Sequence, residues 1–196
     1  MKHSFVILST ILLLSVTGLA GDNPTDKGSL ILTGNAYFMS QSGDLWESGG
    51  GDALTTFAIM PEVGYFITPG LLIGGNVTFN RLSQGDASRT DFAIGPTLGY
   101  YFNSDPMRTE IKGAVYPFVS GFFNYGQSKF DGGDWTSTTD ILLFGGQGGI
   151  VYMLSDAVGL NAGVSVWFDS YDYEGATESI KGTTIQVGVG FTSFLY

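Results

Sequence analysis

Apolar and polar residues alternate one by one along several parts of this chain. The alternation is clearest in residues 157–169, where one set of positions carries Val, Leu, Ala and Phe and the other carries Gly, Asn, Ser, Trp and Asp. A period of two residues is typical of a β-strand with two different faces, and no segment after Ala20 keeps the 3.6-residue apolar period of a helix. The pattern therefore predicts an all-β protein.

Eight segments share this alternation, and we predict a strand for each: 29–40, 53–67, 71–82, 91–102, 112–126, 138–153, 157–169 and 183–196. Four connections are mostly long, acidic and rich in Gly and Ser: 41–52, 83–90, 127–137 and 170–182. Two others are tight turns, at 68–70 and 154–156, and only the connection around 103–110 breaks the rule by being longer than a simple turn. An even number of strands with long loops at one rim and short turns at the other is typical of bacterial outer-membrane barrels. We therefore predict a monomeric, eight-stranded, antiparallel up-and-down transmembrane β-barrel with both termini in the periplasm.

The polar face of the predicted strands decides which face is inside. A soluble, lipocalin-like barrel also has eight strands, but its polar face meets water and usually carries many charged residues. Here that face consists of Gly, Asn, Ser, Thr and Gln, with Glu62 as the main charged exception. Such a face suits an enclosed lumen, and the Val, Leu, Ile and Phe face suits lipid, where a charge near the midplane costs roughly 2 to 4 kcal/mol.

The N-terminus has the features of a secretory signal peptide. Lys2 and His3 precede an almost wholly apolar run at residues 5–16, and Gly18 and Ala20 are small residues at the two positions that a signal peptidase reads. The run is too short to span a bilayer as a helix. We expect residues 1–20 to be cleaved and residues 21–196 to form the barrel domain of an exported protein.

Charge and cysteine content exclude several classes of function. The chain has eight Lys and Arg against 18 Asp and Glu, which argues against a nucleic-acid partner or a polybasic contact with anionic lipid. It has no cysteine, so neither a disulfide nor a lipoprotein anchor is available. Packing and hydrogen bonds alone must hold the fold together.

A ten-residue stretch occurs twice, as FAIMPEVGYF from Phe57 and FAIGPTLGYY from Phe92. Each copy carries a proline at its midpoint, Pro61 and Pro96, although proline has no N–H to give to a strand ladder. A closed barrel has no edge at which to place them, so we predict a bulge or a locally lengthened hydrogen bond at each. The tyrosines that fall near short turns or at the chain end are expected to form a periplasmic aromatic girdle: Tyr65, Tyr100, Tyr152 and Tyr196.

The stretches PEVGYF, PTLGYYF, TPGLLIGGNVTF and YPFVSGFFNYG resemble the eight-stranded outer-membrane β-barrel family, called porin-like or OmpX/OmpA-barrel-like. The final SFLY resembles the C-terminal strand signal that the barrel-assembly machinery recognises. Phe194 and Tyr196 stand in the opposite phase to Phe191, so we expect a bulge or a loss of alternation near Thr192. The resemblance implies the barrel, with outer-membrane lipid, lipopolysaccharide and the assembly machinery as partners, but no activity, because members of the family do different jobs.

The sequence argues against an enzyme. The only histidine is His3, so the mature chain lacks both His and Cys, the usual general base and the most reactive nucleophile. The resemblance points the same way, because the enzymes among outer-membrane barrels rely on histidine. The glycine-rich stretch 145–149 has no Lys-Ser/Thr and no helix after it, so it fits small lumen residues better than a phosphate-binding loop. We expect no cofactor.

Glu62 is predicted to lie inside the barrel near the short-turn rim. A buried carboxylate needs a partner, and Arg108 or Lys112 at the same rim is a candidate. Our hypothesis is an ion pair that plugs or gates the interior, and the alternative is a Glu62 in a wet vestibule, hydrogen-bonded to Asn and Thr.

The outer connections carry tryptophans and acidic residues that are candidates for external contacts: Trp46, Trp135, Asp131, Asp134, Asp172 and Glu174. The acidic groups lack the fixed spacing of a calcium-binding EF-hand loop, so we predict no metal site. Each Trp is a contact residue or packs and anchors its loop.

Two functions remain open from the sequence. The preferred one is a non-enzymatic surface barrel that supports envelope integrity or contact with a partner, because eight strands leave an interior about filled by side chains. The rival is a narrow passage for small or hydrophobic solutes, which the Gly-rich, lightly charged lumen favours. A soluble ligand carrier is third.

Overall fold

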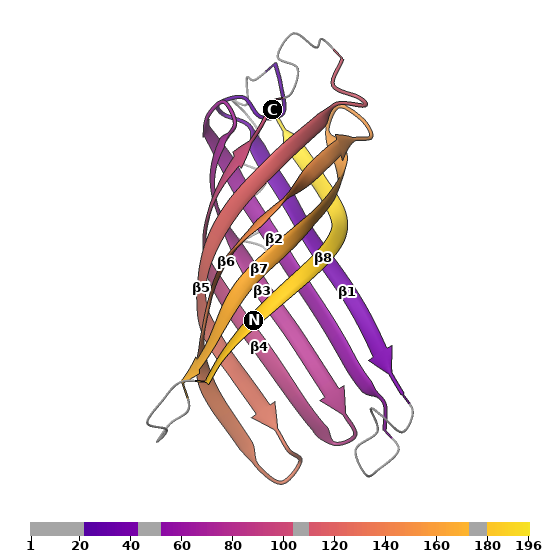
Figure 1. Cartoon of the computed structure of the whole chain (residues 1–196), viewed down its shortest axis with the longest axis vertical. Coiled ribbons are helices and arrows are strands. Elements are labelled where there is room, and N and C mark those ends of the chain that lie inside the picture. Colours follow the sequence, from indigo (N-terminus) through magenta and orange to yellow (C-terminus); the bar gives the residue numbers. More distant parts are fainter. Residues whose placement is uncertain (1–21, 43–51, 104–109, 173–179) are drawn as a thin grey trace, which may run out of the picture.

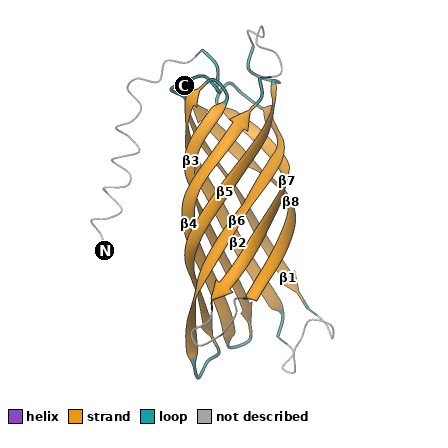
Figure 2. Ribbon diagram, turned by 60° about the vertical axis from the view of Figure 1, so that its left-hand side comes forward, coloured by secondary structure: helices purple, strands orange, loops and turns teal. Residues whose placement is uncertain are grey.

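The computed structural model describes residues 22–42, 52–103, 110–172 and 180–196 (Figure 1). Its eight strands are β1 (Leu30–Gln41), β2 (Leu54–Thr68), β3 (Leu71–Gln84), β4 (Ala87–Tyr101), β5 (Val115–Asp131), β6 (Thr136–Met153), β7 (Val158–Asp172) and β8 (Ile180–Leu195). Each pairs antiparallel with its neighbour in sequence and β8 pairs with β1, so the sheet closes into the predicted up-and-down barrel (Figure 2). No helix in these residues has the length and apolarity that a membrane crossing requires.

The two faces of the wall follow the predicted alternation. On β4, Phe92, Ile94 and Leu98 point outward and are exposed, whereas Ala93 and Thr97 between them are buried in the lumen. Successive side chains of a strand point to opposite faces, so one apolar face and one small or polar face arise from a single strand. The barrel thus presents its large apolar side chains to the outside.

We call the rim where β1 begins and β8 ends the terminal rim, and the opposite one the distal rim. The predicted tight turns lie at the terminal rim, where Gly70 takes a φ of 79° that only glycine adopts without strain. At the distal rim, the prediction of long loops at 83–90 and 127–137 was wrong. β3 and β4 are joined by two residues, and β5 and β6 are separated by residues 132–135, because polar residues continue the strand alternation past the apolar belt.

Each repeated proline interrupts one ladder and leaves the other intact. Pro61 stays in register with Gly34 of β1, but on the other side β2–β3 pairing stops at Ile59 and resumes at Glu62. Pro96 likewise stays in register on β3, whereas β4–β5 pairing stops at Ile94 and resumes at Thr97. Because both ladders resume in the same register, neither proline makes a bulge, and the missing N–H opens the ladder locally.

The C-terminal strand keeps its alternation to the end, so the irregularity expected near Thr192 does not occur. The registers of β8 with β7 and with β1 run through this residue without a shift. Phe191 points outward, whereas Thr192 and Phe194 are buried in the lumen. The aromatic residue near the chain end changes phase because it belongs to the interior.

Large side chains fill the lumen next to the terminal rim. This cluster, which we call the inner plug, consists of Ile31, Phe66, Leu72, Tyr101, Ala114, Tyr116, Phe118, Val151, Met153 and Phe194. Tyr101 lies at its centre, stacked on Phe118 at 5.2 Å between ring centroids and edge-on to Phe66 at 5.5 Å. The plug draws on strands from all around the barrel, and therefore fixes the spacing of the wall at this end.

The segment before β1 packs over the terminal rim. The backbone N–H of Gly70 donates to the carbonyl of Thr25 at 2.8 Å, and that of Phe66 donates to the carbonyl of Ser29 at 2.9 Å. Thr25 and Ser29 are buried. These bonds satisfy backbone groups beside the β2–β3 turn, so the segment extends the closure made by the inner plug.

Candidate functional site

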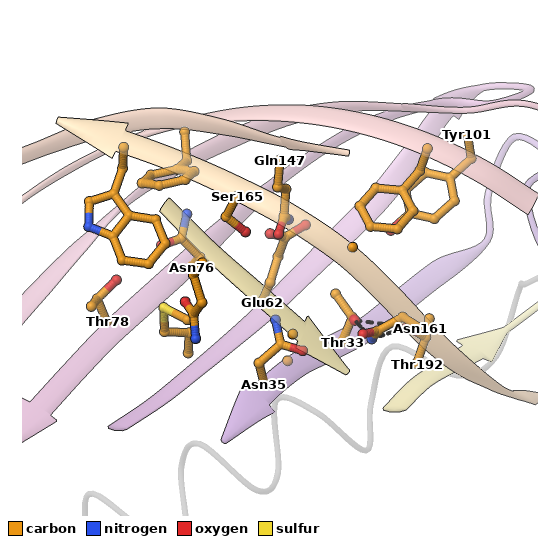
Figure 3. A pocket seen from close by; sticks show the side chains of 18 residues that line it. Thr33, Asn35, Glu62, Asn76, Thr78, Tyr101, Gln147, Asn161, Ser165 and Thr192 are labelled. Carbon is orange, nitrogen blue, oxygen red and sulfur yellow. Dashed lines mark hydrogen bonds between the residues drawn. The ribbon is translucent and has the colours of Figure 1, made fainter. Parts of the chain in front are cut away.

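A cavity lies in the lumen, beyond the inner plug toward the distal rim (Figure 3). Its free volume is about 60 Å³, which is room for water but not for a larger molecule. Tyr101 and Phe118 of the inner plug line it together with polar side chains that include Thr33, Asn35, Glu62, Asn76, Gln147 and Gln186. The cavity is therefore a polar chamber whose floor is aromatic.

Two hydrogen-bonded networks fix part of the chamber wall. Asn161 Nδ2 donates to Thr33 Oγ1 and Thr192 Oγ1, both at 3.0 Å, and the two hydroxyls lie 2.8 Å apart. This network joins β7, β8 and β1, and it therefore crosses the β1–β8 pairing that closes the barrel.

The second network joins β3, β4 and β5. Asn76 Nδ2 donates to Thr97 Oγ1 at 2.7 Å, while Asn124 Nδ2 donates to Asn76 Oδ1 and, at 3.2 Å, to Thr78 Oγ1. The network gives the amide donors of Asn76 and Asn124 their partners, whereas Asn124 Oδ1 has none in the described residues.

Glu62 is a buried carboxylate in the chamber, on the strand where the sequence placed it. It stands opposite Thr33 of β1 and Asn76 of β3 in the two ladders. Figure 3 shows its side chain and that of Gln147 reaching toward each other. Lys112 lies in the β4–β5 connection and Arg108 lies outside the described residues, so the proposed ion pair stays a prediction.

Five buried side-chain oxygens in the described residues lack a hydrogen-bond partner, and two of them belong to residues that line the cavity. They are Asn35 Oδ1 on β1 and Gln186 Oε1 on β8, and both atoms are buried. A buried amide oxygen without a partner costs about 1 to 3 kcal/mol, so a wall with two of them is suited to a ligand or water that donates hydrogen bonds.

A charged cluster that the sequence did not indicate lies nearer the distal rim. Arg89 Nε donates to Asp91 Oδ1 at 2.9 Å and to Ser128 Oγ at 3.1 Å. Its guanidinium also stacks over the ring of Tyr171, 4.4 Å from the centroid. The alternation of Arg89 and Asp91 puts both in the lumen, whereas the sequence predicts a connection at 83–90 and so leaves Arg89 out of the strand.

The distal-rim residues proposed for contacts divide into described and undescribed ones. Trp135 is exposed and packs on Phe130 of the same hairpin, 4.9 Å between centroids. Asp131 Oδ1 accepts the Gly133 N–H at 3.2 Å, which makes it a turn-forming residue, and Asp134 is exposed in that turn. Trp46 and Glu174 lie outside the described residues, and Asp172 is described only as the last residue of β7.

No three His, Cys, Asp or Glu side chains in the described segments form a group that could hold a metal ion.

The tyrosines proposed for a girdle lie in two environments. Tyr65, Tyr100 and Tyr152 are exposed on the outer face near the terminal rim. Tyr196 instead packs against the inner plug, and its hydroxyl donates to the carbonyl of Asp156 at 2.9 Å. Burial, and then the Asp156 carboxylate, raise the pKa of Tyr196, so the hydroxyl keeps its proton at neutral pH. Three tyrosines thus face outward and one belongs to the rim closure.

Comparison with known proteins identifies the architecture. No family model and no curated relative matches the chain. Among solved structures, Neisserial surface protein A is similar at a TM-score of 0.53 and 17% identity, over 85% of this chain and 97% of that one. The N-terminal β-barrel domain of Pseudomonas aeruginosa OprF is similar at 0.52 and 11%, over 86% and 98%. The chain therefore has the fold of the eight-stranded outer-membrane β-barrels, as its motifs predicted.

Proposed function

We propose that this protein is a non-enzymatic barrel of the bacterial outer membrane that supports envelope integrity or contact with a surface partner. In this account the terminal rim faces the periplasm, and the distal hairpins and connections face the outside. The outward Val, Leu, Ile and Phe side chains contact lipid. Lipopolysaccharide and the barrel-assembly machinery are the further partners that we propose for such a barrel.

The inner plug is the observation that carries this proposal. Tyr101 contacts Phe66, Phe118 and Phe194, so rings from β2, β4, β5 and β8 meet in the lumen. Interiors of proteins pack as densely as organic crystals, and such a cluster leaves no continuous aqueous path along the axis. An eight-stranded barrel filled in this way acts through its surface, and its interior serves as a support.

The lack of catalytic chemistry supports the same proposal. A general base or nucleophile acts when a second group orients it beside the substrate. The lumen chamber offers amides, hydroxyls and one carboxylate, Glu62, in a chain whose only histidine is His3. These groups are suited to holding a wall together or binding a polar group.

Conductance in planar bilayers tests the proposal against its rival, a narrow channel. We expect the unmodified protein to be silent and the double variant Tyr101→Ala, Phe194→Ala to show discrete openings, because the plug loses two rings. The matched control is Tyr100→Ala, which removes a ring from the outer face and should stay silent. Discrete openings in the unmodified protein would favour transport of small solutes.

A further inference from the structure

The lining of the chamber contains one charged side chain, and its charge is negative. Glu62 is 7% exposed, and among the described residues no Lys, Arg or His lines the cavity around it. Arg89 lies outside this lining and pairs with Asp91. An ionised carboxylate is costly to bury without an opposite charge beside it. The chamber therefore needs a positive charge that its own lining does not supply.

The side chains next to Glu62 are neutral. Thr97 forms a side-chain hydrogen bond with its carboxylate, and Figure 3 shows the side chain of Gln147 reaching toward it. Thr33 and Asn76 stand opposite Glu62 in the two ladders of β2. A hydroxyl or an amide N–H can donate to the carboxylate, but neither balances its charge.

Unpartnered acceptors face the same space. Asn35 Oδ1 and Gln186 Oε1 are buried and have no hydrogen-bond partner in the described residues, and both side chains line the cavity. Thr33 is opposite Glu62 and Asn35 is opposite Met60, so Asn35 is the diagonal neighbour of Glu62 on the lumen face. Amide carbonyl oxygens coordinate cations as well as accept hydrogen bonds.

Gln186 ends a polar row on the wall of the chamber. Gln147 of β6 is opposite Ser165 of β7, which in turn is opposite Gln186 of β8, and all three line the cavity. Adjacent strands lie about 4.8 Å apart, so the row offers amide and hydroxyl oxygens at close spacing. The carboxylate of Glu62 on β2 and neutral oxygens from β1, β6, β7 and β8 thus border one small space.

The size and charge of this space select the ligand. A free volume of about 60 Å³ holds a few water molecules, or an ion with part of its water shell. One carboxylate balances one positive charge, and neutral carbonyl oxygens can replace the water shell of K⁺. Mg²⁺ gives up its water reluctantly and suits the space less well. An alkali ion also needs no group of three His, Cys, Asp or Glu side chains, which the described segments lack.

From these observations we infer that the chamber binds a single monovalent alkali ion, K⁺ or Na⁺, against Glu62. The carboxylate supplies the charge, and Asn35 and Gln186 supply neutral oxygens. Asn35 follows Gly34, the last residue of β1 that pairs with β8, so the ion holds β1, β2 and β8 together where the closing ladder ends. This site goes beyond the proposed surface role and does not depend on the orientation of the barrel in the membrane.

The stability of the barrel in different salts tests this site. The full chain, refolded in phosphatidylcholine vesicles, is unfolded with urea in KCl, NaCl or choline chloride at one ionic strength, since choline is too large for the chamber. We expect a higher urea midpoint in KCl or NaCl, with a gain that saturates as the alkali ion increases, because a ligand that binds only the folded state stabilises it. Equal midpoints in all three salts would overturn the proposal.

A charge-removing variant and a matched control locate the ion. Glu62→Gln keeps the shape of the side chain without its charge and should abolish the difference between alkali and choline salts. Asp140→Asn removes an exposed carboxylate from the outer face of β6 and should leave the difference unchanged. A difference that survives Glu62→Gln would place the ion elsewhere and contradict the proposal.

Lys112 provides the competing explanation, because the sequence suggests it as a partner of Glu62. If the ion neutralises Glu62, Lys112→Met should leave the effect of KCl on the urea midpoint unchanged. An effect of KCl that appears only after Lys112 is removed would show that Lys112 supplies the positive charge, and would contradict the proposal.

The neutral ligands are tested by removing one carbonyl oxygen. Gln186→Met keeps the length of the side chain and should raise the half-saturating alkali concentration about tenfold, the factor that about 1.4 kcal/mol produces. Asn80 Oδ1 also lacks a partner in the described residues, but Asn80 does not line the cavity, so Asn80→Leu is the control and should cause no change. An unchanged concentration for Gln186→Met would contradict the proposed ligands.

Crystallography with Tl⁺ locates the ion directly and does not depend on the folding of a variant. Tl⁺ resembles K⁺ in charge and radius and scatters X-rays anomalously. In crystals of the unmodified chain soaked with thallium acetate, we expect one anomalous peak in contact with the Glu62 carboxylate. An ordered water at this position without an anomalous peak would overturn the proposal.

Discussion

The two halves of the lumen are built on different principles. Next to the terminal rim, the inner plug is apolar and aromatic, and β1 and β8 are paired beside it. Toward the distal rim, amides, hydroxyls and the Arg89–Asp91 ion pair lie beside a smaller apolar cluster of Ala93, Ile141 and Leu143, and β1 and β8 separate. Apolar packing is dense and holds the wall together, whereas polar networks leave space and acceptors. On our proposal, the terminal half closes the lumen.

The largest effect should come from the terminal half. Phe66 is fully buried in the plug, whereas its neighbour Tyr65 points outward. Phe66→Ala should lower the free energy of unfolding by about 3 to 5 kcal/mol, because it leaves a cavity among rings. Urea unfolding in lipid vesicles measures this, with Tyr65→Ala as the control. Similar losses for both variants would mean that the plug does not stabilise the barrel.

Removing an amide from the distal half should have a smaller effect. Asn161 donates to both Thr33 and Thr192. Asn161→Ala should cost about 1 to 3 kcal/mol in the same assay, because it leaves two hydroxyls short of a donor. A loss of unfolding free energy as large as that of Phe66→Ala would mean that the polar network stabilises the barrel as much as the inner plug does.

The repeated prolines allow a test of the ladder itself. Pro61→Ala restores an N–H opposite β3, and we expect the new amide to be protected from hydrogen exchange. The stability gain should be about 1 kcal/mol or less, because a net hydrogen bond is offset by the greater freedom of the unfolded chain. Rapid exchange at residue 61 would show that the interruption has another cause.

The smallest effect should come from the distal ion pair. Arg89 is partly exposed, and exposed pairs contribute about 0.2 to 1 kcal/mol. Arg89→Met keeps the aliphatic stem and should reduce stability by that amount at low salt, with the difference shrinking as salt screens the pair. An effect that does not change with salt would assign the contribution to stacking on Tyr171.

The sequence predicted the barrel because alternation is a local property of each strand. It placed all eight strands and the lumen position of Glu62. It misplaced the distal hairpins, since the polar residues of 83–90 and 127–137 look like loops although they continue a strand beyond the apolar belt.

Features that depend on several strands were beyond the sequence. The phase of Phe194 looked like an irregularity because its partners, Tyr101 and Tyr116, are distant in the chain. The Arg89–Tyr171 contact and the early end of the β1–β8 ladder also require the closed barrel. Neither the chamber nor its unpartnered acceptors could be located without them.

Access to the chamber from its two ends tests most directly whether the inner plug closes the lumen. Ser165 lines the chamber, and Ser165→Cys gives a chain with a single cysteine. In vesicles that hold the barrel in one orientation, a membrane-impermeant thiol reagent is added from either side. We expect modification from the distal side only, because the inner plug closes the terminal end. Equal modification from the terminal side would contradict the account.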